Sequence, residues 1–294
     1  MKAKYLITFL MIIGACHSTL SFGKGIYLTE IWSLSESLSK PESVIYDQDR
    51  DVLYVSNIDG SGAAKDGNGY ITKVSMQGKV LDKAWVTGLD APKGLAMLNN
   101  NLYVSDIDEL IVIDIKAGKI SARHAAEGAQ FLNDVAVDAN GNVYVSDTRG
   151  NRIYRLNNGK LDIWLNEKLL ANPNGLYIEN ESLIMAAADV DAAEPGSSRY
   201  LQKVSLKSKK IKALADKKFA GNLDAIEAEM SGGYFLTDWK AGKVIHFSKA
   251  NGARVLLEPG PGTADLDYIA DNSLLVVPVM LANKLIAYQV KTAR

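Results

Sequence analysis

Six units with the same internal pattern recur along the chain, and this repeat constrains the fold more than any other feature. Each unit has two short apolar runs separated by a turn, as in residues 131–147, where Asp138-Ala139-Asn140-Gly141 is a tight-turn signal. The steps between units are 51, 40, 41, 50 and 40 residues. A period of about 40 to 50 residues filled with short strands is typical of propeller blades, so the repeat predicts an all-β, six-bladed β-propeller. The units begin at Glu42, Lys93, Asn133, Asn174, Asp224 and Ala264.

The first and last strands are expected to close the ring together. Residues 26–32 look like a strand, yet they precede the first full unit. The sixth unit supplies only three strands, at 264–269, 274–279 and 284–290, before the chain ends at Arg294. We therefore expect the N-terminal strand to form the outer edge of the sixth blade, which leaves no long exposed edge. The expected propeller domain spans residues 26–294.

A leader is expected before the propeller. Lys2 and Lys4 precede an apolar run at 5–13, which is too short to span a membrane. Ile-Gly-Ala-Cys at 13–16 resembles a bacterial lipobox, so residues 1–15 are interpreted as a lipoprotein signal peptide and Cys16 as the lipidated residue. A conventional signal peptide extending to about residue 23 is the alternative. Either way, we expect export to the periplasm, with an outer-membrane lipid anchor in the first case.

Charge and composition exclude some partners and leave others open. The chain has 33 basic and 34 acidic residues, and no basic stripe or aromatic platform suggests nucleic-acid binding. Cys16 is the only cysteine, so no intramolecular disulfide can form. The expected partner is a small-molecule substrate, the only expected membrane contact is the lipid anchor, and the protein is expected to be a monomer.

Two insertions account for the longer steps of the repeat, at 59–69 in the first unit and 189–199 in the fourth. The first insertion is rich in glycine, which could suggest a calcium loop or a phosphate cradle. It lacks the Glu that ends an EF-hand loop and the Gly-Lys-Ser/Thr that a P-loop needs. We interpret it as a flexible loop at the rim of the propeller.

Two sets of polar residues are expected at one mouth of the central channel, because each inner strand starts there and its hairpin partner returns. The first set begins the units and includes two carboxylates and two amides, whose burial without partners costs roughly several kcal/mol per unpaired charge. A cation would offset that cost, and oxygen ligands suit a hard ion such as Ca²⁺. Lys93 is expected to pair with Asp106. The second set ends the returning strands, with turn chemistry as its open alternative, and comprises Asn57, Asp106, Asp147 and Asp238.

The unit starts carry a family resemblance. Pro41-Glu42-Ser43-Val44, Asn133-Asp134-Val135-Ala136-Val137-Asp138, Pro173-Asn174-Gly175-Leu176 and Leu223-Asp224-Ala225-Ile226 resemble the gluconolactonase, regucalcin and luciferin-regenerating-enzyme superfamily over residues 26–290. The resemblance implies a divalent cation held by Glu42, Asn174 and Asp224. It implies that Asn133 contacts the substrate or completes the metal site, as in the related diisopropylfluorophosphatase. Ca²⁺ is the expected ion, with Zn²⁺, Mg²⁺ and Mn²⁺ as alternatives.

The resemblance also implies metal-assisted hydrolysis of a lactone or related ester in the central tunnel. Asp224 is the expected general base or nucleophile, with Asn133 beside it as the second catalytic residue. Sugar lactonases of the superfamily carry a substrate-binding Arg where this chain has Phe131, which favours a less polar substrate. The expected substrate pocket consists of Lys93, Phe131 and the second set of residues, Asn57, Asp106, Asp147 and Asp238.

Other chemistries find less support in the sequence. There is no Gly-x-Ser-x-Gly elbow, and His124 and His246 fall on expected outer strands, where we interpret them as structural. Two alternatives to a metal-dependent hydrolase remain open. One is a non-catalytic propeller that binds a ligand or a protein, and the other is a strictosidine-synthase-like enzyme that uses the tunnel without a metal.

Overall fold

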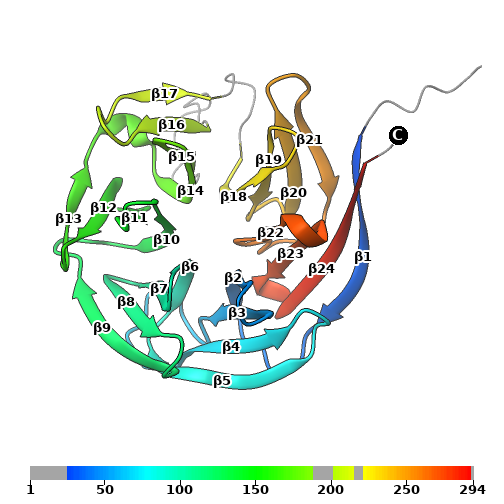
Figure 1. The fold of residues 1–294 in the computed structure, drawn as a ribbon, viewed down its shortest axis with the longest axis horizontal. Helices are drawn as coiled ribbons and strands as arrows, with labels where there is room; N and C mark the ends of the chain where they lie inside the picture. The colour runs from blue at the N-terminus through cyan, green and yellow to red at the C-terminus, as the bar shows by residue number, and fades with distance from the viewer. Residues whose placement is uncertain (1–24, 188–200, 215–220, 293–294) are drawn as a thin grey trace, which may run out of the picture.

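The structure is a computed structural model that describes residues 25–187, 201–214 and 221–292. It consists of six four-stranded antiparallel sheets arranged as the blades of a ring around a central channel (Figure 1). The predicted six-bladed β-propeller is thereby confirmed. The leader, with the proposed lipidation site Cys16, and the whole insertion at 189–199 lie outside the described residues. Within the described ranges, no helix has both the length and the apolar character needed to cross a bilayer.

Each of blades 1 to 5 is a meander whose first strand lies innermost. Blade 1 comprises β2 (Pro41–Asp47), β3 (Val52–Asn57), β4 (Gly69–Ser75) and β5 (Val80–Leu89). Blade 2 comprises β6 (Pro92–Leu98), β7 (Asn101–Asp106), β8 (Glu109–Asp114) and β9 (Lys119–Ala125). Blade 3 comprises β10 (Leu132–Val137), β11 (Val143–Asp147), β12 (Arg152–Asn157) and β13 (Lys160–Leu165).

The remaining strands follow in the same order. Blade 4 comprises β14 (Pro173–Glu179), β15 (Ser182–Ala187), β16 (Gln202–Ser205) and β17 (Ile211–Ala213). Blade 5 comprises β18 (Leu223–Glu229), β19 (Gly233–Asp238), β20 (Lys243–Ser248) and β21 (Gly252–Leu257). Blade 6 comprises β22 (Asp267–Ile269), β23 (Leu274–Val279), β24 (Lys284–Thr292) and, from the start of the propeller, β1 (Ile26–Leu34). Three short 3₁₀ turns lie between strands, η1 (Lys168–Leu170), η2 (Ala270–Asn272) and η3 (Met280–Ala282).

The closure of the ring matches the expectation from the sequence. β1 pairs antiparallel with β24 from Ile26 opposite Thr292 to Leu34 opposite Leu285. Figure 1 shows these two strands side by side at the outer edge of the sixth blade. The Trp32 indole N–H also donates to the Met76 carbonyl at 2.9 Å, which links β1 to blade 1. The first and last parts of the propeller are therefore held together by main-chain pairing.

Apolar side chains fill the spaces between neighbouring blades. Between blades 1 and 2, Tyr54, Leu89, Leu102 and Ile111 form part of one buried cluster, and each is fully buried. Burying side chains of this size stabilises the fold by about 1.5–3 kcal/mol each. This packing fixes each blade against its neighbours, so residues at equivalent positions of different blades lie at the same height along the channel axis.

A β-bulge follows the first residue of the inner strand in each of blades 1 to 5. In blade 3, for example, Leu132 pairs with Asp147 and the next regular pair is Val135 with Val145, so one extra residue lies on β10. A bulge breaks the alternation of the strand and re-aims the side chains within it. The residue immediately after the first pair is a unit-starting residue in every case, namely Glu42, Lys93, Asn133, Asn174 and Asp224.

The hydroxyl residues near the end of the returning strands support these bulges. Ser146 Oγ accepts the main-chain N–H of Asp134 at 2.9 Å, and Thr237 Oγ1 accepts that of Ala225 at 2.9 Å. Each accepted N–H belongs to the second residue of a bulge, which has lost its partner in the ladder. Ser56 Oγ likewise accepts the N–H of Ser43 at 2.9 Å, so this contact accounts for three of the four hydroxyl residues that precede Asp or Asn. The fourth, Ser105, donates instead to the Asn133 carbonyl.

Candidate active site

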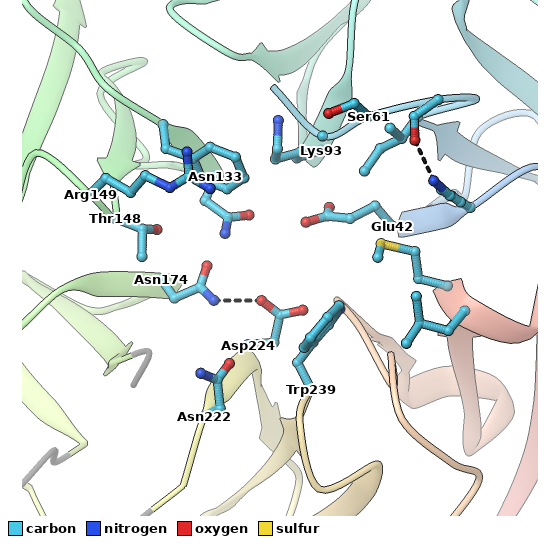
Figure 2. Close-up of a pocket in the computed structure, with 17 residues that line it drawn as sticks. Glu42, Ser61, Lys93, Asn133, Thr148, Arg149, Asn174, Asn222, Asp224 and Trp239 are labelled. Atoms are coloured by element: carbon cyan, nitrogen blue, oxygen red, sulfur yellow. Dashed lines mark hydrogen bonds between the residues drawn. The ribbon is translucent and has the colours of Figure 1, made fainter. Parts of the chain in front are cut away.

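A cavity of about 570 Å³ opens at one mouth of the central channel. Its size is in the range of small-molecule sites. Figure 2 shows the side chains of four bulge residues from blades 1, 3, 4 and 5 converging inside it: Glu42, Asn133, Asn174 and Asp224. Lys93 and Phe131 line it as well. The structure therefore brings together the three residues that the family resemblance implied as metal ligands and Asn133, which it implied as a substrate contact or a further ligand.

Three of these four residues have a buried oxygen without a hydrogen-bond partner: Oε2 of Glu42, Oδ1 of Asn174 and Oδ2 of Asp224. The Asn174 side-chain amide donates to Asp224 Oδ1 at 2.5 Å and to the Leu223 carbonyl at 3.2 Å, so its nitrogen is occupied and its oxygen is not. An unsatisfied buried acceptor costs about 1–3 kcal/mol, and more when it is charged. Three such acceptors in one cavity indicate that a cation or a hydrogen-bond donor binds there.

These residues fit a divalent cation. Their free atoms are carboxylate and amide oxygens, the donors that hard ions prefer. No group of three or more His, Cys, Asp or Glu that could hold a metal occurs among the described residues. The cavity instead combines the two carboxylates of Glu42 and Asp224 with the amides of Asn133 and Asn174. Such a set leaves positions for water or substrate oxygens in the coordination shell.

Burial controls the protonation of these groups. It raises the pKa of Asp224 to about 7, and it raises the pKa of Glu42 well above the ordinary value, with repulsion from Asp224 adding to the effect. The charged carboxylates are thus costly in the protein alone. A bound cation would favour their ionised forms, which links metal binding to proton release.

Lys93 does not form the expected ion pair with Asp106. It is 1% exposed, its ammonium donates to the Ala91 carbonyl at 2.8 Å, and it lies 4.5 Å from the centre of the Phe131 ring. No ion pair joins it to Asp106 within the described residues, because the Asp106 oxygens accept the N–H groups of Asp90 at 2.7 Å and Ala91 at 2.6 Å. Burial lowers the pKa of Lys93 to about 8, although attraction to Glu42 and Asp106 opposes this shift.

The residues that end the returning strands are buried, but none lines the cavity. Asp147 accepts N–H groups from Gln130, Phe131 and Gly150, at distances of 2.9–3.2 Å. Asp238 accepts the N–H of Ala241 at 2.9 Å. Asn57 and Asp106 likewise bind N–H groups of the loop before their own inner strand. These residues therefore do not form part of the pocket, as had been expected. They have the alternative role in turns, because their side-chain oxygens accept N–H groups of the loops.

Several cavity residues escaped the sequence analysis although they follow a regular spacing. The residue directly after the strand end lines the cavity in blades 1, 3 and 5, as Ile58, Thr148 and Trp239. The residue two positions before the bulge residue does the same in these blades, as Lys40, Phe131 and Asn222. Of these, only Phe131 had been identified. The repeat would have identified them if each unit had been extended by one residue after the returning strand and by two residues before the bulge residue.

The loop at 59–69 lies at the rim, where Gly60, Ser61 and Gly62 contribute to the cavity wall. The Lys40 ammonium donates to the Gly60 carbonyl, and Lys65 forms an ion pair with Asp108 at 2.7 Å. These contacts tie the loop to blade 1 and blade 2. Met280 and Leu281 of η3 line the cavity too, and Met280 packs against the cluster that contains Ile58, directly before this loop. Arg149, in the loop after β11, lies on the other side of the cavity (Figure 2).

The two histidines within the described ranges lie away from the cavity. His124 is on β9, the outermost strand of blade 2, and His246 is on β20 of blade 5. His246 lies 3.6 Å from the Glu229 carboxylate, and burial lowers its pKa. Neither residue lines the cavity, which agrees with their interpretation as structural.

A second group of buried carboxylates lies along the inner strands and links neighbouring blades. Asp134 of β10 accepts the N–H of Leu176 in blade 4 at 2.6 Å, and burial raises its pKa to about 8. Asp267 of β22 accepts the N–H of Tyr46 in blade 1 at 2.7 Å. Asp265 accepts the Ser43 hydroxyl at 2.7 Å across the same boundary. These carboxylates have donors from an adjacent blade, so they fasten blades together.

Comparison with known proteins gives one family and several related folds. The family model described as SMP-30/Gluconolactonase/LRE-like region matches residues 40–257. A presumed gluconolactonase solved by X-ray crystallography superposes with a TM-score of 0.66 at 13% identity, covering 91% of this chain and 93% of that chain. A catalytically inactive virginiamycin B lyase from Staphylococcus aureus, solved with quinupristin, gives a TM-score of 0.61 at 13% identity, covering 90% and 99%.

A streptogramin B lyase structure gives a TM-score of 0.60 at 14% identity, covering 90% of this chain and 98% of that chain. At these identities the structural matches show the propeller fold alone. A comparison with curated protein sequences finds no match.

Proposed function

Because the chain belongs to the SMP-30/gluconolactonase/LRE-like family, we propose that it is a divalent-metal-dependent hydrolase that opens a lactone or related ester in this cavity. The family supports a lactonase-type function in general. The observation that carries the more specific proposal is the convergence of three unpartnered oxygens, on Glu42, Asn174 and Asp224, in one buried site.

The residues present would hold the cation through Glu42, Asn133, Asn174 and Asp224. When bound, the cation would supply Lewis-acid polarisation of the ester carbonyl and stabilise the negative charge that develops on its oxygen. Ca²⁺ is our first choice, since the site offers oxygen donors and neither His nor Cys lines the cavity. Zn²⁺, Mg²⁺ and Mn²⁺ are the alternatives.

Asp224 is the proposed general base. Asn174 holds its Oδ1 through the 2.5 Å hydrogen bond and thereby leaves Oδ2 directed at the cavity. In the proposed step, Oδ2 takes a proton from the water that attacks the carbonyl carbon. The bond between the carbonyl carbon and the ring oxygen then breaks, the ring oxygen gains a proton, and the product is an open-chain hydroxy acid. Attack by Asp224 itself on the carbonyl is the alternative use of the same oxygen.

Asn133 is proposed to orient the substrate. It is a buried amide between the bulge residues of blades 2 and 4, and its hydrogen-bonding groups face the cavity with the other ligands (Figure 2). Phe131, Trp239 and Met280 form an apolar part of the surrounding wall. Apolar walls lower the local dielectric and so strengthen the electrostatic interactions on which such a reaction depends.

The location of the protein remains a proposal as well. We propose that it is exported to the periplasm as a monomer and anchored through a lipid on Cys16, on the basis of the lipobox-like Ile-Gly-Ala-Cys at 13–16. Replacing Cys16 with Ser should remove the protein from the membrane fraction or block its processing. Unchanged fractionation, with no fatty acid on the native protein, would instead indicate a soluble exported form.

A metal and substrate survey tests the proposed function. The purified protein is analysed for bound metals, treated with a chelator, reloaded with each candidate cation, and assayed against lactones and aryl esters. We expect hydrolysis that is lost on chelation and restored by one cation. A protein that binds no divalent cation and hydrolyses none of these compounds would leave the non-catalytic binding propeller in its place.

A further inference from the structure

The cavity contains more positive charge than its own carboxylates balance. Three cationic side chains line it, Lys40, Lys93 and Arg149, against the two carboxylates of Glu42 and Asp224. If a divalent cation occupies the proposed site, its charge balances both carboxylates. The three cationic side chains then remain without an opposing charge inside the cavity.

The same residues lack the partners that comparable cations elsewhere possess. Arg152, three positions after Arg149, lies 3.6 Å from the Asp147 carboxylate, and Arg123 pairs with Glu109 at 3.0 Å. Within the described part of the chain, neither Lys93 nor Arg149 forms an ion pair. Both contact the Phe131 ring instead, with the Lys93 ammonium 4.5 Å and the Arg149 guanidinium carbon 4.3 Å from its centre.

Lys93 is the most constrained member of this group. It is 1% exposed, and its one hydrogen bond to the Ala91 carbonyl uses one of three ammonium donors. Burial of an ammonium with free donors costs energy unless a ligand pairs with it. Its contact with Phe131 offsets part of that cost, and repulsion from Arg149 adds to it.

Arg149 can bind a carboxylate through two parallel hydrogen bonds, which the Lys93 ammonium cannot do. Its side chain is exposed at the cavity wall beside Thr148, and Figure 2 shows it extending toward the bulge residues. A guanidinium presents paired N–H donors that match a carboxylate in a bidentate arrangement. The guanidinium lies over the Phe131 ring, with its carbon 4.3 Å from the ring centre, and it forms no ion pair within the described residues, so its N–H groups are available to a ligand.

We propose that the substrate of this site carries a carboxylate in addition to its lactone or ester group, and that Lys93 and Arg149 bind that carboxylate against Phe131. This inference rests on the proposed function and narrows it to anionic lactones or esters. It also changes the meaning of Phe131. The ring is not simply an apolar replacement for a polar contact, because it contacts two cations, one from the inner strand of blade 2 and one from the loop after β11.

The test compares a charged lactone with its neutral analogue, γ-butyrolactone γ-carboxylate and its carboxamide. We expect kcat/KM to favour the carboxylate by about tenfold or more, as for a charge-assisted hydrogen bond. Arg149→Gln should remove most of this preference, and Arg149→Lys should retain part of it. Arg123→Gln is the matched control, because it removes an exposed arginine remote from the cavity.

A binding measurement makes the result independent of turnover. Calorimetric titration with the open-chain product, α-hydroxyglutarate, is done with and without Ca²⁺. We expect the wild type and Arg123→Gln to bind equally and Arg149→Gln to bind about tenfold more weakly or worse. Arg149-dependent binding without hydrolysis would support the anion site and overturn the proposed function. Hydrolysis with no preference for the carboxylate, and equal binding by all variants, would overturn the anion site alone.

Discussion

Two sets of polar residues lie buried near the same channel mouth, and their hydrogen-bond partners distinguish them. In the bulge set, Glu42, Asn174 and Asp224 each keep an oxygen with no partner. In the strand-end set, Asp106 and Asp147 each accept two or more main-chain N–H groups from neighbouring loops. Both sets contain the same residue types at equally regular spacing, so residue type and burial do not separate ligand from scaffold. The unused acceptors do.

The difference has a structural origin in the β-bulge. A strand-end residue pairs opposite the first residue of the inner strand, as Asp147 does with Leu132, and its side chain turns back to the loop. The next residue on the inner strand lies in the bulge, where no regular alternation applies, and its side chain turns to the channel. A shift of one position in the pairing of the two strands thus separates a loop anchor on the returning strand from a candidate ligand on the inner strand.

The sharpest test of this contrast is Asp224→Asn, which keeps the size of the side chain and removes its charge. Because Asp224 is both a proposed ligand and the proposed base, we expect hydrolysis to fall by at least about two orders of magnitude. Thermal unfolding should show that the fold persists. Activity within a few fold of the wild type would exclude Asp224 as the base.

The same substitution in the other set should act on stability. In Asp106→Asn, the amide nitrogen would face one of the two N–H groups that the carboxylate now accepts, at 2.6 and 2.7 Å. We expect the free energy of unfolding to fall by about 2–3 kcal/mol, measured by denaturant titration. If the fold is as stable as the wild type, the interpretation of the strand-end residues as loop anchors fails.

Glu42→Gln should reveal a ligand without a catalytic role. Removing one ligand charge is expected to weaken cation affinity by at least about tenfold, while the base at Asp224 remains. Excess cation should therefore restore much of the activity of Glu42→Gln and little of that of Asp224→Asn. Equal rescue of both variants would remove the distinction between their roles.

Ser146→Ala should have the smallest effect, because it removes only the support behind one bulge. The N–H of Asp134 loses its acceptor at 2.9 Å, and we expect a loss of about 1 kcal/mol in unfolding free energy. A small decrease in kcat should follow, since Asn133 is the neighbouring residue of that bulge. An effect on activity as large as that of Asp224→Asn would assign Ser146 a direct part in the chemistry.

The sequence was sufficient to predict the propeller fold but not the local backbone structure at the mouth of the central channel. The repeat predicted six blades and the closure by residues 26–32, because alternating apolar runs and turns determine strands directly. It did not reveal the bulges, since a bulge is a register shift between two strands. The Ser or Thr that supports it is recognised only once the strands are paired. The expected strand at 264–269 is also shorter, with β22 limited to Asp267–Ile269.

The candidate site shows the same limit. Glu42, Asn133, Asn174 and Asp224 could be named because the motifs around them resemble a known family. Arg149 could not, because its contact with Phe131 joins two loops that no pattern along the chain connects. The pairing expected between Lys93 and Asp106 was wrong for a related reason: the N–H donors that occupy Asp106 belong to the main chain and carry no sequence signal.

Cation binding measured side by side on Asp224→Asn and Asp106→Asn tests whether the bulge residues, and not the strand-end residues, hold a metal. Calorimetric titration of Ca²⁺ into the chelator-treated proteins compares both variants with the wild type. We expect one cation site in the wild type, unchanged affinity in Asp106→Asn and affinity at least about tenfold weaker in Asp224→Asn. A wild type that binds no divalent cation, or an Asp106→Asn variant that loses binding as Asp224→Asn does, would contradict this expectation.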